Sequence, residues 1–233
     1  MSYLYDLWDD FLSLLFPRIC HGCGNHLVRN ETLICTECYI LIPRTDYHLK
    51  ADNPVARIFW GRCTLERAAA FSYYTRDSRI RKLIHQLKYN GLGEIGSELG
   101  RIYGSILKSS DFLDGIDLII PVPLHASKRR KRGYNQCDLI ADGLSQSTGI
   151  PSEKSLLVRI NPTKTQTTKS RYDRWTNVKD TFMLTDKERL YERHVLLVDD
   201  VITTGSTIEA CTVAIQKEAN VKVSVAALAF SAI

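Results

Sequence analysis

No part of this 233-residue chain approaches the roughly 18 consecutive apolar residues that a membrane-spanning helix needs. The first residues also lack the positive charge and the small-residue cleavage site of a secretory signal. The chain also has little excess of one charge: 31 Lys and Arg and 26 Asp and Glu give a net charge of +5. That excess permits an anionic ligand but does not by itself predict a nucleic-acid-binding protein. We expect a cytoplasmic protein without membrane insertion.

The apolar residues between Tyr3 and Phe16 are interrupted by acids, and their spacing predicts an amphipathic helix that ends near Pro17. A helix that binds a membrane surface should carry Lys or Arg on its polar face, whereas this one carries acids. We therefore expect the helix to dock on its own chain.

Four of the seven cysteines form two C-x2-C pairs separated by eleven residues: Cys20, Cys23, Cys35 and Cys38. Two such pairs can complete a tetrahedral sulfur shell, which is typical of a closed, structural zinc site. Two disulfides or four free thiols are the alternatives, and a reducing compartment disfavours the disulfides. The pattern predicts structural Zn²⁺, with a short hairpin over residues 27–34 between the pairs.

Two domains are expected: residues 1–50 as the helix and four-cysteine knuckle, and residues 51–233 as a larger domain, with a linker-like stretch over 43–54. Apolar runs predict strands at 68–74, 116–122, 156–160, 194–198 and 221–230, and helical spacing predicts helices at 78–89, 97–107, 134–147 and 206–219. This alternation predicts an α/β fold whose mostly parallel sheet carries helices on both faces. Ligands of such folds bind beyond the carboxyl ends of the strands.

The sharpest candidate site follows the strand at 194–198. There Asp199 and Asp200 precede a small, hydroxyl-rich loop that opens a helix: Thr203, Thr204, Gly205, Ser206 and Thr207. Two acids can accept hydrogen bonds from vicinal sugar hydroxyls, and the loop amides with the helix N-terminus suit one phosphate monoester. The alternative is an acid pair that merely caps the helix, but capping needs only one such side chain.

These residues resemble the phosphoribosyl-pyrophosphate (PRPP) motif of type I phosphoribosyltransferases. The resemblance implies that Asp199 and Asp200 hold the ribose hydroxyls and have the catalytic role, and that the loop 203–207 holds the 5′-phosphate. It also implies that Mg²⁺ accompanies PRPP.

A second strand end, after residue 122, leads into five consecutive cations at 128–132. In the transferases that the motif resembles, a loop at this place holds the pyrophosphate, which implies a role for His125, Lys128 and Arg132. A charge run is more often a solvated surface, and the other three cations are assigned to the surface. No general base is evident, and Tyr134, His125 and Glu209 are candidates.

A third stretch, residues 159–182, is polar and has poor periodicity. Such a long insertion is either a lid or a disordered segment. In phosphoribosyltransferases a loop at this place closes over the reaction centre, which implies a lid carrying Arg159, Gln166, Arg174 and Asn177.

Together, the segments PVPLHASKRRKRGYNQ and VLLVDDVITTGST, with the Arg, Thr and Gln of the lid, resemble the ComF family. The resemblance implies a zinc knuckle joined to a phosphoribosyltransferase-like domain and a link to DNA uptake in natural transformation. Lys128 and Lys169 stand where Arg and Leu are usual, so an apolar lid contact is in doubt. Two hypotheses stay open: a transferase with an unknown acceptor, or a non-catalytic PRPP-binding module that contacts single-stranded DNA or proteins of the uptake machinery.

Overall fold

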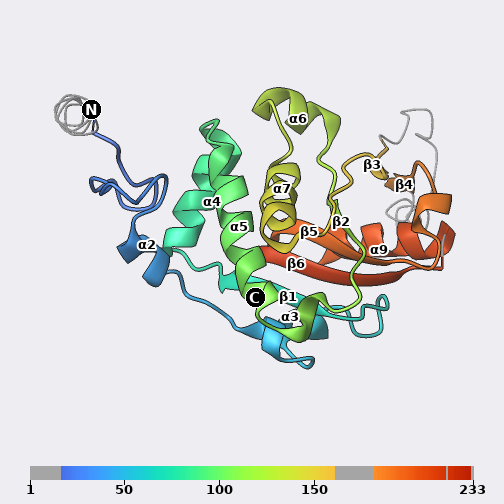
Figure 1. The fold of residues 1–233 in the computed structure, drawn as a ribbon. Helices are drawn as coiled ribbons and strands as arrows, with labels where there is room; N and C mark the ends of the chain where they lie inside the picture. The colour runs from blue at the N-terminus through green and yellow to red at the C-terminus, as the bar shows by residue number, and fades with distance from the viewer. Residues whose placement is uncertain (1–16, 161–180, 219, 232–233) are drawn as a thin grey trace, which may run out of the picture.

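A computed structural model describes residues 17–160, 181–218 and 220–231 (Figure 1). Its main sheet has four strands in the order β1-β6-β5-β2, and all their pairings are parallel. The strands are β1 (Ala68–Tyr73), β2 (Leu118–Pro121), β5 (His194–Ile202) and β6 (Lys222–Phe230). The predicted parallel sheet is thereby confirmed, and the predicted N-terminal helix lies outside the described residues.

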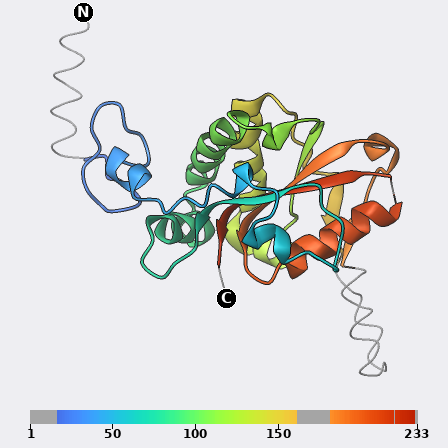
Figure 2. The same ribbon diagram turned by 90° about the horizontal axis from the view of Figure 1, so that it is seen from below.

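Helices cover both faces of this sheet, as predicted. On one face lie α4 (Arg79–Tyr89), α5 (Glu94–Lys108) and α7 (Gln136–Thr148) (Figure 1). On the other lie α3 (Pro54–Arg57) and α9 (Ser206–Glu218), which Figure 2 shows from below. The side chains of β5 alternate between these two cores because successive residues of a strand point to opposite faces.

The helical periodicity of the sequence corresponds to buried faces. In α4 the four predicted apolar residues Ile80, Leu83, Ile84 and Leu87 are all fully buried. In α9 the predicted face of Ile208, Cys211 and Ile215 is buried as well. Each helix therefore docks through the stripe that its sequence pattern predicts. No helix in the described ranges is long and apolar enough to cross a membrane.

The connections reverse direction at one place in the sheet, between β2 and β5. From β2 the chain passes to α7 on one face, whereas from β5 it passes directly to α9 on the opposite face. Neighbouring parallel strands whose following helices lie on opposite faces leave a crevice between their carboxyl ends. Because β2 and β5 are such neighbours, chemistry is expected where both strands end.

Two strands differ from the sequence expectation. The strand predicted at 156–160 is β3 (Leu157–Arg159), which lies outside the main sheet and pairs antiparallel with β4 (Phe182–Leu184). Strand β5 does not end at Val198 but continues to Ile202, because its hydrogen-bonded register with β6 extends to Phe230. Asp199 and Asp200 are therefore strand residues.

The stretch 43–54 is not a free linker. It pairs with the edge of the sheet through a bridge between Arg44 and Ser72 and a hydrogen bond from Thr45 N to Phe71 O. Asn53 then caps α3 with its side-chain oxygen. The stretch also contains the single-turn helix η1 (Tyr47–Leu49), and two further single turns are η2 (Asp111–Leu113) and η3 (Glu188–Leu190).

The knuckle forms a separate lobe beside α4 that contains the short helix α2 (Thr36–Ile40) (Figure 1). Of the hairpin predicted over 27–34, the turn forms, since Glu31 N donates to Val28 O at 2.9 Å, but among the described residues no bridge joins its arms. The antiparallel bridge of this region joins Ile19 to His26 and encloses the first cysteine pair. A hydrogen bond from Gly24 N to Cys20 O at 2.8 Å closes the turn that carries the first cysteine pair.

Candidate functional site

The two acids of β5 face different surroundings. Asp200 is buried, and its carboxylate accepts hydrogen bonds from Lys88 Nζ at 2.8 Å and from Gln136 Nε2. Asp199 is partly buried, and its Oδ1 accepts from Asp200 N at 2.8 Å and from the Cys137 thiol at 3.4 Å. The ligand-capable atoms of Cys137, Asp199 and Asp200 lie within 4.8 Å of one another. Because Lys88 and Gln136 satisfy Asp200, this cluster has the character of a hydrogen-bonded network.

The charges in this cluster follow from burial and proximity. Burial and the neighbouring Asp200 charge together raise the pKa of Asp199 to about 7. Burial opposes a charge on Lys88, but the adjacent Asp200 outweighs it and holds the Lys88 pKa above its usual value. Burial, with the charge of Asp199, keeps the pKa of Cys137 far above its ordinary value, so this thiol is a neutral donor. Asp200 and Lys88 thus form an ion pair beside an acid that titrates near neutrality.

The hydroxyl-rich loop and Asp199 line one small cavity at the carboxyl end of β5. Gly205 has φ +74°, and a Cβ there would lie 2.7 Å from Ile58 Cγ2, so only glycine fits. Arg62 fixes the loop from outside: its Nη1 donates to Thr204 O at 2.7 Å, and the same guanidinium pairs with Glu209. The predicted loop residues are therefore together, at the N-terminus of α9, where partial positive charge favours an anion. Asp200 is absent from the residues that line this cavity.

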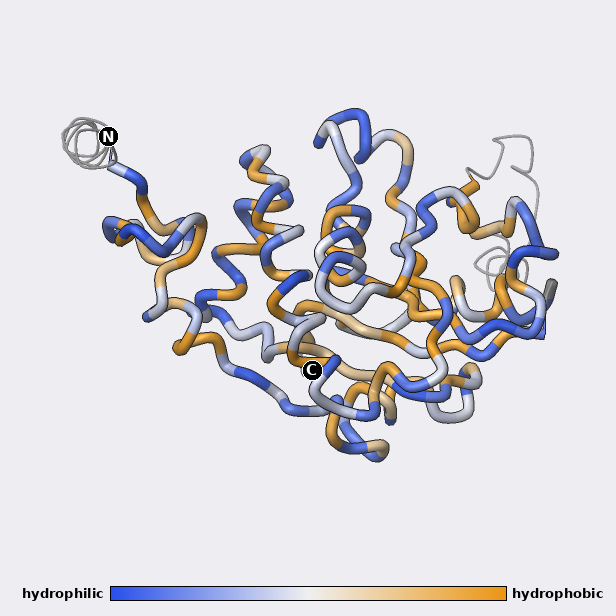
Figure 3. Tube along the Cα trace, viewed as in Figure 1, coloured by the Kyte–Doolittle hydropathy of each residue, from blue (hydrophilic) through white to orange (hydrophobic). Residues whose placement is uncertain are grey.

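The predicted pyrophosphate residues lie on and beside α6 (Ala126–Arg132), a helix that rises above the carboxyl edge of the sheet (Figure 1). His125 caps it, because its Nδ1 accepts from Ser127 N at 3.2 Å. Lys128 is exposed on the helix, which is hydrophilic over most of its length (Figure 3). Arg132 donates to Gln136 Oε1, and its guanidinium lies 5.7 Å from the centre of the Tyr89 ring.

The three candidate general bases each have a structural contact. Tyr134 donates its hydroxyl to Leu87 O, His125 caps α6, and Glu209 is paired with Arg62. Burial also raises the pKa of Tyr134. The identity of a base therefore stays a prediction.

One of the four predicted lid residues lies within the described chain. Arg159 ends β3, where its guanidinium lies 5.4 Å from the centre of the Phe182 ring. Gln166, Arg174 and Asn177 lie outside the described residues. The pairing of β3 with β4 brings residues 159 and 182 side by side, so both ends of the predicted lid meet at one place.

Sequence reasoning missed Lys88, Gln136, Cys137 and Arg62. A signal existed for Lys88, which follows Ile84 by four residues and therefore borders the buried stripe of α4. Gln136 begins α7 directly after a capping Asn135, and both are buried. Arg62 carries no sequence signal, because its partners lie 142 and 147 residues away.

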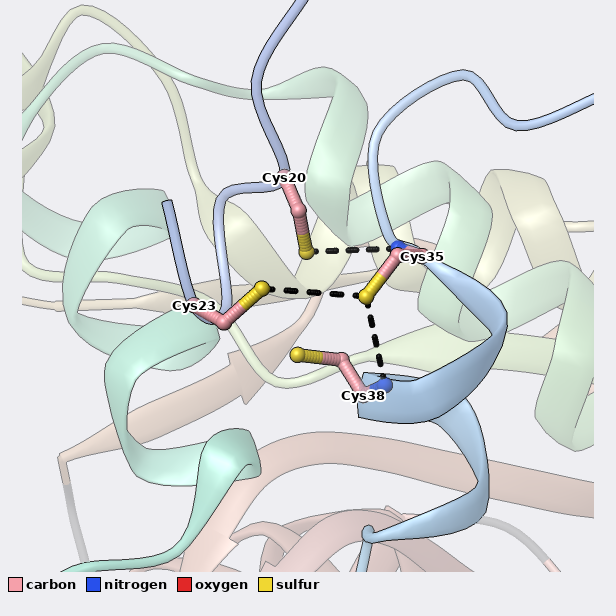
Figure 4. A group of neighbouring side chains, drawn as sticks. All are labelled: Cys20, Cys23, Cys35 and Cys38. Carbon is pink, nitrogen blue, oxygen red and sulfur yellow. Dashed lines mark hydrogen bonds between the residues drawn. The ribbon is translucent and has the colours of Figure 1, made fainter. Parts of the chain in front are cut away.

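The four predicted cysteines converge in the knuckle, with their sulfurs turned toward one another (Figure 4). All four Sγ atoms lie within 4.8 Å of one another, and the Cys23 and Cys35 sulfurs are 3.7 Å apart. A tetrahedral shell with metal–sulfur bonds of about 2.3 Å has sulfurs about 3.8 Å apart. A Cβ on Gly22 would lie 2.9 Å from Cys38 Sγ, so glycine is needed for this approach. The cluster fits a single metal ion.

Amide donors favour the thiolate of Cys20. Cys20 Sγ accepts from Cys35 N at 3.2 Å and from Gly22 N at 3.3 Å. Burial opposes ionisation of Cys20, but these amide donors outweigh it and lower its pKa to about 7. Burial raises the pKa of Cys38. Cys38 is therefore a thiol in the free protein, and a divalent cation that binds the four sulfurs would displace its proton.

Curated relatives match most of the chain. Competence protein F of Haemophilus influenzae is 31% identical over 212 residues, which cover 86% of this chain and 91% of that protein. DNA utilization protein YhgH of Escherichia coli O157:H7 is 32% identical over 193 residues, 82% of this chain and 80% of its own. Competence protein ComFC of Bacillus subtilis is 26% identical over 199 residues, 84% and 78% of the two chains.

No family model matches the chain. Among solved structures, a glutamine PRPP amidotransferase from B. subtilis aligns with a TM-score of 0.39 and 20% identity, over 56% of this chain and 26% of that one. A score this low supports no argument about this chain.

Proposed function

This chain belongs to the ComF family, and on that premise we propose that it binds magnesium–PRPP at the carboxyl end of β5 and acts in the uptake or use of DNA. The observation that carries the proposal is the cavity that Asp199 shares with the loop 203–207 at the N-terminus of α9. A carboxylate that can accept from sugar hydroxyls and a helix N-terminus that can bind a phosphate line the same cavity.

The chemistry that this site can support is displacement at ribose C1. Loss of pyrophosphate builds positive charge on the sugar, which Asp199 and Asp200 would stabilise, and negative charge on the leaving group. Mg²⁺ bound with PRPP would neutralise the pyrophosphate, and we assign its contacts to His125, Lys128 and Arg132, on and beside α6. Arg159 and the remaining lid residues would cover the site.

Turnover separates the two open hypotheses. The full-length protein is incubated with magnesium–PRPP and a panel of purine and pyrimidine bases, and released pyrophosphate is measured. Release that depends on one base supports a transferase. Binding of PRPP without release under any base supports a PRPP-binding module. A protein that shows neither binding nor release contradicts the proposed function.

We further propose that the four-cysteine cluster holds structural zinc and that residues 1–50 form a unit of their own, which joins 51–233 where Arg44 and Thr45 pair with the sheet edge. Thiolate ligands favour zinc among abundant divalent ions, and four of them leave no coordination position open for catalysis. The ion would fix the lobe in which α2 and the bridge from Ile19 to His26 are otherwise the only regular structure among the described residues.

A second candidate function, single-stranded DNA binding, is favoured by a groove between the knuckle and α4. The groove has a volume of about 450 Å³. Its cationic side chains are Arg76, Arg81 and Lys82, and His21 and His85 lie beside them. Among the described residues that line it, none is acidic. A surface of this kind suits the phosphate backbone of a nucleic acid, with release of counterions on binding.

Exchange of two groove cations for acids should weaken DNA binding. In Arg81→Glu plus Lys82→Glu, fluorescence anisotropy with a labelled oligonucleotide should give a higher Kd and a salt dependence shallower by about one unit per lost phosphate contact. Lys217→Glu, on the exposed side of α9, is the matched control and should leave both quantities unchanged. Equal binding by the double variant and the control would exclude the groove as the DNA site.

A further inference from the structure

Each oxygen of the Asp200 carboxylate has a hydrogen-bond partner before any ligand arrives. Lys88 Nζ donates to Oδ1 at 2.8 Å, and Gln136 Nε2 donates to Oδ2. The Asp200 side chain is 7% exposed and the Lys88 side chain 21%, so water screens this ion pair only weakly. Lys88 comes from the last turn of α4 and Gln136 from the first turn of α7. Two helices thus meet on a single acid at the end of β5.

The network continues toward the other candidate subsite. Gln136 also accepts, through Oε1, a hydrogen bond from Arg132 Nη1. Arg132 in turn lies against Tyr89, the residue that follows Lys88 and ends α4. Arg132, Gln136, Asp200 and Lys88 therefore form one connected chain. This chain runs from the basic end of α6 to the acid of the sugar site.

The two neighbouring acids consequently differ in what they can offer a ligand. Asp199 lines the loop cavity, and no hydrogen bond to its Oδ2 is present among the described residues. Asp200 does not line that cavity, and both of its oxygens already have partners. Asp199 is the acid placed to receive new hydrogen bonds, and Asp200 is the acid whose orientation is fixed.

We propose, on the premise that PRPP binds at this site, that Lys88 and Gln136 are positioning residues that hold Asp200 and Arg132 in one preformed unit. A fixed Asp200 orients Asp199, whose Oδ1 accepts from Asp200 N at 2.8 Å, toward the sugar, and Gln136 orients Arg132 toward the pyrophosphate. Affinity is then not spent on ordering these groups. Without Lys88 the Asp200 carboxylate is a buried charge without a counter-ion, so it takes up a proton or turns away. Without the Gln136 amide, Arg132 loses its link to the acid.

The experiment is a calorimetric titration of the full-length protein with magnesium–PRPP and, separately, with ribose 5-phosphate. The wild type, Lys88→Met, Lys88→Arg and Gln136→Leu are compared, and Lys108→Met at the exposed end of α5 is the charge-matched control. We expect Lys88→Met to weaken PRPP binding roughly 10- to 100-fold, as displacement of a positioned group does. Lys88→Arg keeps the charge and should restore most of the affinity. Gln136→Leu should weaken PRPP more than ribose 5-phosphate, which has no pyrophosphate for Arg132 to meet.

Thermal melting of the ligand-free variants separates positioning from folding. If Lys88→Met melts far below the wild type, Lys88→Met plus Asp200→Asn removes the unpaired charge and should recover the melting temperature without recovering PRPP affinity. The proposal is overturned if PRPP binds wild type and Lys88→Met within twofold of each other. It is also overturned if a normally folded Lys88→Arg binds as weakly as Lys88→Met. A wild type that does not bind PRPP instead overturns the proposed function on which this inference rests.

Discussion

Cys38→Ser should abolish metal binding by the knuckle and leave the α/β domain folded. The wild type is expected to carry about one zinc per chain, and the variant close to none, because three thiolates and a hydroxyl do not complete the closed sulfur shell. Cys38 is fully buried, and its backbone N donates to Cys35 Sγ at 3.4 Å. The measurement is elemental analysis of the purified protein, combined with limited proteolysis to locate the loss of structure.

Cys63→Ser is the matched control, because Cys63 is a cysteine outside the knuckle that packs against the core beneath the sheet. It should retain zinc and resist the protease as the wild type does. Cleavage of the Cys38→Ser variant should fall within residues 17–50. A wild type purified without metal, or a Cys38→Ser variant that keeps its zinc, would contradict the assignment.

The largest effect on ligand binding is expected from Asp199→Asn plus Asp200→Asn. A hydrogen bond to a charged group contributes about 1.5–3 kcal/mol, so loss of the charged acceptors should weaken magnesium–PRPP binding by two orders of magnitude or more. The readout is the Kd from calorimetry. Asp114→Asn, an exposed acid near the opposite end of β2, is the control and should bind as the wild type does. Unchanged affinity in the double variant would remove the acids from the site.

The acid with the raised pKa makes this binding depend on pH. Since the pKa of Asp199 is about 7, its carboxyl group is largely protonated at pH 6 and largely ionised at pH 8. Sugar hydroxyls donate more strongly to the ionised form, so affinity for magnesium–PRPP should rise across this interval. The stability of the ligand-free protein should change with pH in the opposite direction. In the folded state Asp199 keeps a proton that it has lost in the unfolded state above pH about 4. Its free energy of unfolding therefore falls between pH about 4 and 7. The single variant Asp199→Asn should lose the part of each trend that Asp199 contributes, so both slopes should be shallower than in the wild type.

The sequence predicted the fold because the strands of the main sheet are buried on both faces. The residues of His194–Val198 are all buried, and such strands appear as continuous apolar runs instead of alternating ones. The helical spacing of apolar residues was an equally reliable signal, since all four apolar residues predicted to face inward in α4 are buried. Strand ends were harder to place. Asp199 and Asp200 look like the start of a loop, and only pairing with β6 keeps them extended.

The candidate site was predictable only where it is local in sequence. The loop 203–207 and the cysteine pairs are contiguous or closely spaced motifs, and each converges as its spacing indicates. The partners of Asp200 are not local, because Lys88 lies 112 residues away and Gln136 lies 64 residues away. A basic residue bordering the buried stripe of a helix is visible in the sequence, but its partner is set by how α4 and α7 pack on the sheet.

The short antiparallel pair β3–β4 is another case in which the sequence indicates an element but not its partner. The apolar run at Leu156–Ile160 is strand-like, and the structure does form a strand there. Its partner, however, is Phe182–Leu184, which follows it in the sequence after the long polar insertion and pairs with it antiparallel. Propensity predicts extended backbone, whereas the choice of a partner strand depends on tertiary packing.

The most direct test of the account is titration of the full-length wild-type protein with PRPP in the presence of Mg²⁺. We predict a saturable, one-to-one binding isotherm and a rise in melting temperature with ligand concentration, as expected for a ligand that binds only the folded state. Ribose 5-phosphate should compete for the same site with lower affinity. The absence of both binding heat and a melting shift at millimolar PRPP would contradict the assignment of the β5 edge as a sugar-phosphate site.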